Sequence, residues 1–298
     1  MLLVAFLVFS LLYLAPGDPA AIIAGDQATP ADLERIHQSL GLDRPFLVRF
    51  FEWLGHVATG DLGTSIFTNL PVSHMIGQRI EPTVSLLLLT LALSIVFAIP
   101  IGVLAAWRQG TIIDRALMLI SVLGFSTPVF VIGYLLAYVF GLRLDVLPVQ
   151  GYVPISDGFF PFLRSLVLPS IALSLVYSAL IARVTRAAML EVISHDYIRT
   201  AKAKGLPWKN ILFVHALKNA SIPIVTIIGI GFSTLIGGAV VTESVFALPG
   251  LGRLTVDAIL RRDYPVIQGV VLFFSFMYVL VNLIVDIVYM LVDPRIRY

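Results

Sequence analysis

The sequence predicts an all-α integral membrane protein with six transmembrane helices, and three observations favour this fold class. Of the 298 residues, 58% are hydrophobic and 13% are charged, whereas soluble domains are about a quarter charged. The mean hydropathy is +0.96, and apolar runs reach about 20 residues, the length of a bilayer-crossing helix. Lys and Arg are unevenly distributed among the connecting segments. We therefore expect a single transmembrane domain, 1–298, in a lipid bilayer.

Five segments are long and apolar enough to cross the bilayer as helices. They are 83–107, 116–140, 163–182, 222–242 and 266–292. Four prolines fall in or at the edges of these segments: Pro100, Pro128, Pro169 and Pro223. We expect the spans to tolerate them, because neighbouring helices satisfy the carbonyl groups that a proline frees.

The sixth apolar segment, 1–15, is short. At 1.5 Å per residue it reaches only about 22 Å as a helix, against about 30 Å of hydrocarbon. A cleaved signal peptide is the alternative, but such peptides begin with a positive region, and the first Lys or Arg in the sequence is Arg35. We expect a first transmembrane helix whose cytoplasmic start lies upstream of Met1.

The distribution of basic residues predicts the orientation of the six spans. With the amino terminus inside, the inner segments carry 11 Lys and Arg in 54 residues; they are 107–115, 183–220 and 292–298. The outer segments carry 8 in 112 residues; they are 16–82, 141–162 and 243–265. The higher density inside follows the positive-inside rule. The basic loop 183–220 is therefore predicted to be cytoplasmic.

A short helix is predicted within this loop. Asp196 is suited to cap its amino terminus, Tyr197 to Lys204 are compatible with a helix, and Gly205 is suited to a left-handed carboxyl cap. Tyr197, Ala201 and Lys204 fall on one face by helical spacing. This face suits a groove on another protein, although an anionic lipid surface explains the charge equally well. Both interpretations stay open on the pattern alone.

Several motifs occur in an order that resembles a known family. The stretch "RVTRAAMLEVISHDYIRTAKAKGL" is followed by "HALKNASIPIVT". The motifs "APGDPA", "LGLDRP" and "GDLGTS" precede this pair, and "TESVFALPGLGRL", "RRDYPVIQG" and "DPRIRY" follow it. Together they resemble permease subunits of bacterial ATP-binding-cassette (ABC) importers, in the dipeptide/oligopeptide/nickel branch, almost from end to end.

The resemblance implies a type I ABC importer permease fold in which the short helix is the coupling helix. Thr200, Ala201 and Gly205 match the family's loop motif, and Arg199 stands where many importers have glutamate. The residues implied to contact the ATPase are Tyr197, Arg199, Thr200, Ala201, Lys204 and Gly205. The longer spacing from this motif to Pro223 matches the peptide branch.

The resemblance also implies partners, location and cargo. The partners are a homologous permease subunit, two ATP-binding subunits and an extracytoplasmic solute-binding protein. The location is the bacterial inner membrane, which the chain crosses several times. The cargo is di- or oligopeptide, with glutathione-like peptides and nickel chelates as alternatives. The long outer segment 16–82, with a helix expected over 29–41, either covers the permease or meets the binding protein.

The sequence favours no enzyme, cofactor or metal site. It contains no phosphate-binding loop and no H-E-x-x-H motif, so ATP hydrolysis is expected in separate subunits. Its five histidines all fall outside the predicted spans, and it has no cysteine, which disfavours an intramembrane protease and thiolate metal sites. A net charge of +2 gives no reason to expect nucleic acid. A passive channel also needs no catalytic residue, but it has no use for an ATPase-docking helix.

Two sets of residues inside the spans are further candidates. Asp286 is the only carboxylate in a predicted span, with Asn282 one turn earlier; we favour a structural hydrogen bond to a neighbouring helix over a functional site. Gly229, Ser233 and Gly237 recur every four residues. Small residues at this spacing allow close helix packing, and the same stripe is suited to border a translocation path.

Overall fold

The computed structural model describes residues 1–14, 29, 30, 34 and 44–292. In the described part of the chain every regular element is a helix, apart from an isolated bridge between Thr64 and Pro71. This confirms the all-α fold class. The chain divides into two compact units, residues 1–80 with 253–277 and residues 81–252 with 278–298. The prediction of one domain stays a prediction.

Four predicted spans are confirmed as long apolar helices. They are α5 (Val72–Trp107), α8 (Phe159–Ile193), the continuous helical stretch Trp208–Val245 and α13 (Tyr264–Val292). The third of these consists of α10 (Trp208–Asn210), the wider π-helical η3 (Ile211–Ala216) and α11 (Leu217–Val245). All four extend beyond the apolar segments that predicted them, because helix geometry continues into the polar ends.

The remaining long apolar segment, 116–140, was predicted to be one span, and this prediction is wrong as a continuous helix. The structure has α6 (Ile112–Ser126), a break at Thr127 and Pro128, then α7 (Val129–Leu136) continuing into η1 (Ala137–Arg143). The two halves are bent by 100°. Pro128 has no N–H to donate to the preceding turn, and Thr127 is extended, with φ −88° and ψ 124°, as expected for the residue before a proline.

The sixth predicted span corresponds to α1 (Leu2–Leu14), which has 13 residues. The described residues contain four helices long enough to cross a membrane, or five if the bent pair is one span. A span at 1–15 therefore stays a prediction. The helix expected over 29–41 lies largely outside the described residues.

The first unit contains α1, α4 (Phe46–Ala58), the start of α5, most of α12 (Leu251–Arg261) and the first half of α13. Phe6 and Phe9 of α1 pack edge-to-face on the rings of Phe46 and Phe50 of α4, with centroids 5.4–5.6 Å apart. The buried Asp263, just before α13, accepts hydrogen bonds from Ser65 Oγ (2.5 Å) and the Ile66 N–H (3.2 Å). These bonds fasten the loop after α4 to the start of α13.

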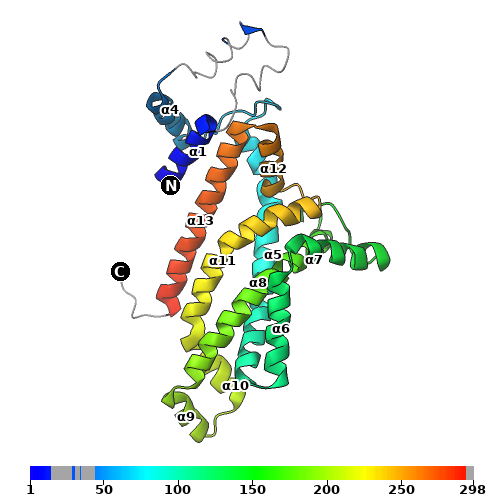
Figure 1. The fold of residues 1–298 in the computed structure, drawn as a ribbon, viewed down its shortest axis with the longest axis vertical. Helices are drawn as coiled ribbons and strands as arrows, with labels where there is room; N and C mark the ends of the chain where they lie inside the picture. The colour runs from blue at the N-terminus through cyan, green and yellow to red at the C-terminus, as the bar shows by residue number, and fades with distance from the viewer. Residues whose placement is uncertain (15–28, 31–33, 35–43, 293–298) are drawn as a thin grey trace. The chain divides into compact units, whose positions relative to one another are not determined.

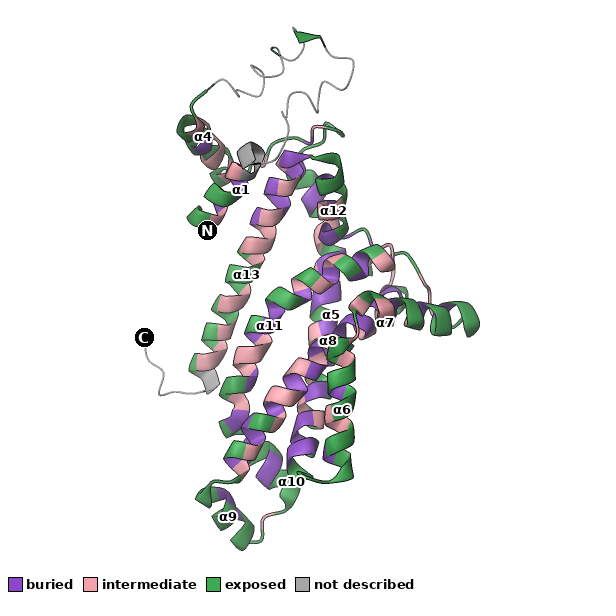
Figure 2. Ribbon diagram, in the orientation of Figure 1, coloured by how far each residue is buried: buried purple, intermediate pink, exposed green. Residues whose placement is uncertain are grey.

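The second unit is built around α8, which contacts α6, α7 and α11. Buried residues recur along most of its length, as Figure 2 shows. Close approach is permitted by small residues: a Cβ at Gly102 of α5 would lie 2.6 Å from Thr185 Cβ of α8. The Tyr177 hydroxyl of α8 donates to the Ile228 carbonyl of α11 at 2.5 Å. Such contacts make α5, α8 and α11 one packed body.

The two ends of this unit agree with the predicted orientation. At one end, where α9 (Asp196–Ala203) and α10 lie (Figure 1), Trp107 contacts Trp208 with ring centroids 6.3 Å apart. Two predicted inner segments therefore meet there. At the other end the Gly151 N–H donates to the Phe246 carbonyl at 3.2 Å, which joins two predicted outer segments.

This orientation predicts opposite labelling of two engineered cysteines. The chain has no cysteine of its own, and Ser194 and Thr59 are both exposed. We expect Thr59→Cys to react with an impermeant maleimide in intact cells and Ser194→Cys to react only after the membrane is permeabilised. Labelling of both positions in intact cells would contradict the topology.

Candidate functional site

The short helix predicted in the basic loop is α9, and its carboxyl end is as predicted. Gly205 has a φ of +75°, the left-handed conformation that glycine adopts without strain. The N–H groups of Gly205 and Leu206 bond to the carbonyls of Lys202 (3.0 Å) and Ala201 (3.3 Å). The prediction for the amino terminus was wrong, because the cap position belongs to His195 and Asp196 lies in the first turn. There the negative charge of Asp196 interacts favourably with the helix dipole.

The direction in which α9 faces differs from the prediction. Ala201 is buried together with Ile198, and α9 packs on η3. The Tyr197 hydroxyl accepts a hydrogen bond from Asn219 Nδ2 of α11 at 3.0 Å. The face expected to point outward therefore lies partly against the chain itself. Ile198 and Ala201, three residues apart, form the apolar stripe that seats the helix.

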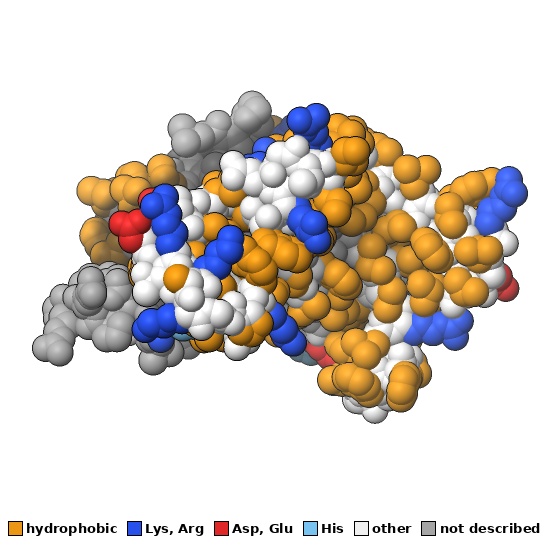
Figure 3. Space-filling view, turned by 90° about the horizontal axis from the view of Figure 1, so that it is seen from below, with side chains coloured by type: hydrophobic (Ala, Val, Ile, Leu, Met, Phe, Trp, Pro, Cys, Tyr) orange, Lys and Arg blue, Asp and Glu red, His pale blue; other side chains and the backbone are white. Residues whose placement is uncertain are grey.

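The outward face of α9 consists of exposed side chains at helical spacing. It comprises Asp196, Arg199, Thr200 and Ala203. Arg199 and Thr200 were predicted members of the site, while Ala203 was missed although it follows Thr200 by three residues and Arg199 by four. Seen from this end of the molecule, Lys and Arg side chains outnumber acidic ones (Figure 3). On this face Arg199 is paired with Asp196 at 3.2 Å, beside the small side chains of Thr200 and Ala203, and the buried residues Ile198 and Ala201 lie on the opposite side.

An ion pair that the prediction did not include braces the same end. Arg186 of α8 makes two hydrogen bonds to Asp114 of α6, Nε to Oδ1 at 2.6 Å and an Nη to Oδ2 at 2.8 Å. The Asp114 side chain is only 5% exposed and also accepts from the Gly110 N–H at 3.0 Å. Bidentate geometry of this kind is among the stronger polar contacts in proteins. It ties the loop after α5 to α8.

A second buried carboxylate lies near the opposite end. Glu243 of α11 is fully buried and accepts a hydrogen bond from Thr83 Oγ1 of α5 at 2.6 Å. Thr83 Oγ1 in turn accepts from the Leu251 N–H at 2.8 Å. A Cβ at Gly250 would lie 2.2 Å from Glu243 Cδ, so glycine is needed where the loop passes the carboxylate. The motif "TESVFALPGLGRL" thus fastens the loop after α11 to α5.

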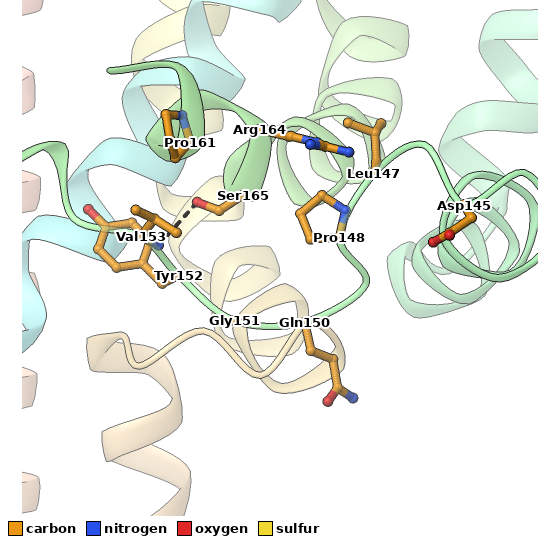
Figure 4. Close-up of a pocket in the computed structure, with 10 residues that line it drawn as sticks. All are labelled: Asp145, Leu147, Pro148, Gln150, Gly151, Tyr152, Val153, Pro161, Arg164 and Ser165. Atoms are coloured by element: carbon orange, nitrogen blue, oxygen red, sulfur yellow. Dashed lines mark hydrogen bonds between the residues drawn. The ribbon is translucent and has the colours of Figure 1, made fainter. Parts of the chain in front are cut away.

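A cavity of about 470 Å³ lies at this end, lined by ten residues between Asp145 and Ser165 (Figure 4). Arg164 crosses it and donates to the Val146 carbonyl at 2.8 Å. The Val153 N–H donates to Ser165 Oγ at 3.4 Å. Burial raises the pKa of Tyr152 to about 12, so this side chain stays neutral at physiological pH.

The candidates inside the spans are not brought together into a site. The Asn282 amide donates to the Tyr278 carbonyl of its own helix at 2.8 Å, and Asp286 is exposed on α13. The expected bond to a neighbouring helix is instead made on the next turn, where the Tyr289 hydroxyl donates to Thr226 Oγ1 at 2.8 Å. A functional role for Asn282 and Asp286 stays a prediction.

The small-residue stripe of α11 has two different environments. Gly229 packs against α13, since a Cβ there would lie 2.8 Å from a Val285 methyl. Ser233 and Gly237 are exposed, and a Cβ at Gly237 would meet nothing within 4 Å. Gly237 instead borders a mostly apolar cavity of about 540 Å³ beside the break at Thr127. Close helix packing therefore explains the small residue at Gly229 but not those at Ser233 and Gly237.

Comparison with known families decides which class of membrane protein has this arrangement. Residues 98–298 match the family described as the binding-protein-dependent transport system inner membrane component. The chain belongs to this family. Residues 1–87 match the corresponding amino-terminal family of the same membrane components. With the apolar helices described above, the chain is a multi-pass permease subunit of an ABC transporter, which sets aside the passive channel and the intramembrane protease.

Relatives of this permease subunit have similar length. A probable peptide ABC transporter permease from Sinorhizobium fredii is 53% identical over 298 residues, which cover 100% of this chain and 95% of the relative. A putative peptide transport system permease from Brucella abortus is 47% identical with the same coverage. A glutathione transport system permease from Salmonella typhi is 42% identical, again over 100% and 95%.

The fold of this permease subunit is similar to that of a solved ABC transporter. The inward-facing MetNI methionine ABC transporter matches it with a TM-score of 0.61 at 18% sequence identity. The match covers 74% of this chain and 96% of the other. The predicted type I importer permease fold is confirmed.

Proposed function

We propose that this permease subunit imports di- or oligopeptides across the bacterial inner membrane, with α9 docked on an ATP-binding subunit. The observation that carries the docking is the seat of α9. Ile198 and Ala201 are buried in the chain while Arg199, Thr200 and Ala203 stay exposed. A helix that only rested on lipid would direct its apolar stripe toward the membrane. Here the apolar stripe of α9 is buried against η3 of the same chain.

The full machine would contain a homologous permease subunit, two ATP-binding subunits and an extracytoplasmic binding protein. ATP-driven closure of the ATPases draws the two coupling helices together and opens the cavity outward, and hydrolysis resets it. The chain's contribution is a rigid path from α9 to the spans, because α9 sits on η3, which continues directly into α11.

The proposal that ATP is hydrolysed by separate subunits is tested with the purified chain alone. Since the sequence contains no phosphate-binding loop, we expect no ATP hydrolysis and no saturable ATP binding until purified ATP-binding subunits are added. Hydrolysis by a preparation free of partner subunits would contradict the proposal.

The peptide cargo is supported by the named functions of the peptide and glutathione relatives. It is tested by uptake into proteoliposomes that contain the full complex and the binding protein. We expect labelled dipeptides to be imported and unlabelled oligopeptides to compete. Competition by glutathione alone would narrow the cargo to that tripeptide, and competition only by nickel chelates would contradict the peptide assignment.

A further inference from the structure

A stack of two indole rings and two cations connects the coupling helix with the end of α5. Trp107 is the last residue of α5, and Trp208 is the first residue of α10. Their ring centroids are 6.3 Å apart with an interplanar angle of 49°. Arg108 lies over the Trp107 ring at 4.4 Å, and Lys202 of α9 lies over the Trp208 ring at 5.1 Å. We call these four residues the tryptophan stack.

Both ends of the tryptophan stack are attached to the parts that a coupling movement must join. Lys202 is on α9, and Trp208 follows the Gly205 turn by three residues. At the other end, the loop after Trp107 is held by the Gly110 N–H and by Asp114, which is paired with Arg186 of α8. The two rings therefore lie between α9 and the end of α5.

The exposure of the rings argues against a purely structural core. Trp107 is 37% exposed and Trp208 is 36% exposed, whereas core side chains such as Ile211 and Met189 are fully buried. The two cations provide attraction at the ring faces without burial. The tryptophan stack is thus a surface contact between two separate segments, and this contact can be kept or broken when α9 moves.

We infer that the tryptophan stack is the mechanical link through which movement of α9 is transmitted to α5. The inference rests on the proposed function, because it presumes that an ATPase moves α9. In this account Trp107 and Trp208 are positioning residues: they contact neither cargo nor nucleotide. Anchoring of the two indoles in the lipid headgroup region is the competing role.

The transport test uses the complete complex in proteoliposomes, with uptake, ATP hydrolysis and bound ATPase measured on the same preparation. For Trp208→Leu we expect retained ATPase subunits and retained hydrolysis, with cargo imported per ATP reduced by about 5-fold or more, the lower range of typical coupling effects. Trp208→Phe keeps an aromatic face and should stay close to wild type. Trp53→Phe, which changes the only other tryptophan, is the matched control.

An unchanged ratio of uptake to hydrolysis in Trp208→Leu would overturn the inference and leave lipid anchoring. Loss of the ATPase subunits from this variant would also overturn it, because Trp208 would then belong to the docking contact.

A second measurement needs no partner subunit. In Trp53→Phe protein only Trp107 and Trp208 remain, and excitation should migrate between rings 6.3 Å apart. We expect its fluorescence anisotropy to be lower than that of either single-tryptophan chain, made by adding Trp107→Phe or Trp208→Phe. Equal anisotropy in the two-tryptophan and single-tryptophan chains would show that Trp107 and Trp208 are not in contact. If wild-type chain bound no ATPase while the anisotropy was lowered, the proposed function and not the stack would fail.

Discussion

Gly205→Val should abolish ATP-driven uptake, while Gly205→Asn should largely retain it. Gly205 has a φ of +75° and a Cβ there would meet nothing within 4 Å, so the effect comes from the backbone and not from a clash. A left-handed conformation costs an ordinary L-residue about 1–2 kcal/mol, and more for a β-branched one. Asparagine visits this conformation more readily.

The strain in Gly205→Val is relieved if the turn opens. The hydrogen bonds from Gly205 and Leu206 to the last turn of α9 would then be lost, and the helix would leave its seat. Both variants should reach the membrane normally, because the position lies outside every span. Uptake and co-purified ATPase are the measurements, and full uptake by Gly205→Val would contradict the role given to this turn.

Arg186→Met should lower the stability of the chain by about 3 kcal/mol, the lower range for breaking a buried ion pair. The Asp114 side chain is 5% exposed and would lose two hydrogen bonds of 2.6 and 2.8 Å. The Arg186 side chain is 27% exposed, which places the effect at the low end of that range. The carboxylate would keep the hydrogen bond from the Gly110 N–H and lose its ion-pair partner.

Thermal unfolding in detergent measures this effect, with Asp114→Asn combined with Arg186→Met as the matched control. The double variant should be more stable than Arg186→Met alone, because it no longer leaves a buried charge unpaired. Equal unfolding temperatures for wild type and Arg186→Met would show that the pair does not hold this end of the chain together.

Much of the fold could be predicted because a bilayer imposes a simple length and polarity rule on its helices. Four spans follow from apolar runs alone. The 100° bend between α6 and α7 did not follow, since 116–140 is apolar on both sides of Pro128 and hydropathy carries no information about direction.

The candidate site could be predicted in position but not in orientation. The cap at Gly205 is a local backbone property and was readable from the sequence. The direction of α9 depends on whether Ile198 and Ala201 can be buried against another part of the chain, and η3 provides that surface. The Asp114–Arg186 pair joins residues 72 positions apart, and the Thr83–Glu243 bond spans 160. Pairings of this kind come from the packed fold and leave no local pattern.

The most direct test of the docking proposal is the amount of ATP-binding subunit that co-purifies with variants of α9. Ala203→Asp places an acid on the outward face without touching the buried seat, and an unpaired charge buried in an interface costs several kcal/mol. The matched control is Lys202→Gln with Lys204→Gln, which removes the charge that a lipid surface would attract and leaves the outward face intact.

Docking predicts that Ala203→Asp inserts normally in the membrane and loses the ATPase, while the double lysine variant keeps it. Ala201→Asp, in contrast, should also lose the ATPase but by unseating α9, because this side chain is 9% exposed and faces the chain. A full complement of ATPase on Ala203→Asp, with loss only from the double lysine variant, would contradict docking through the outward face of α9.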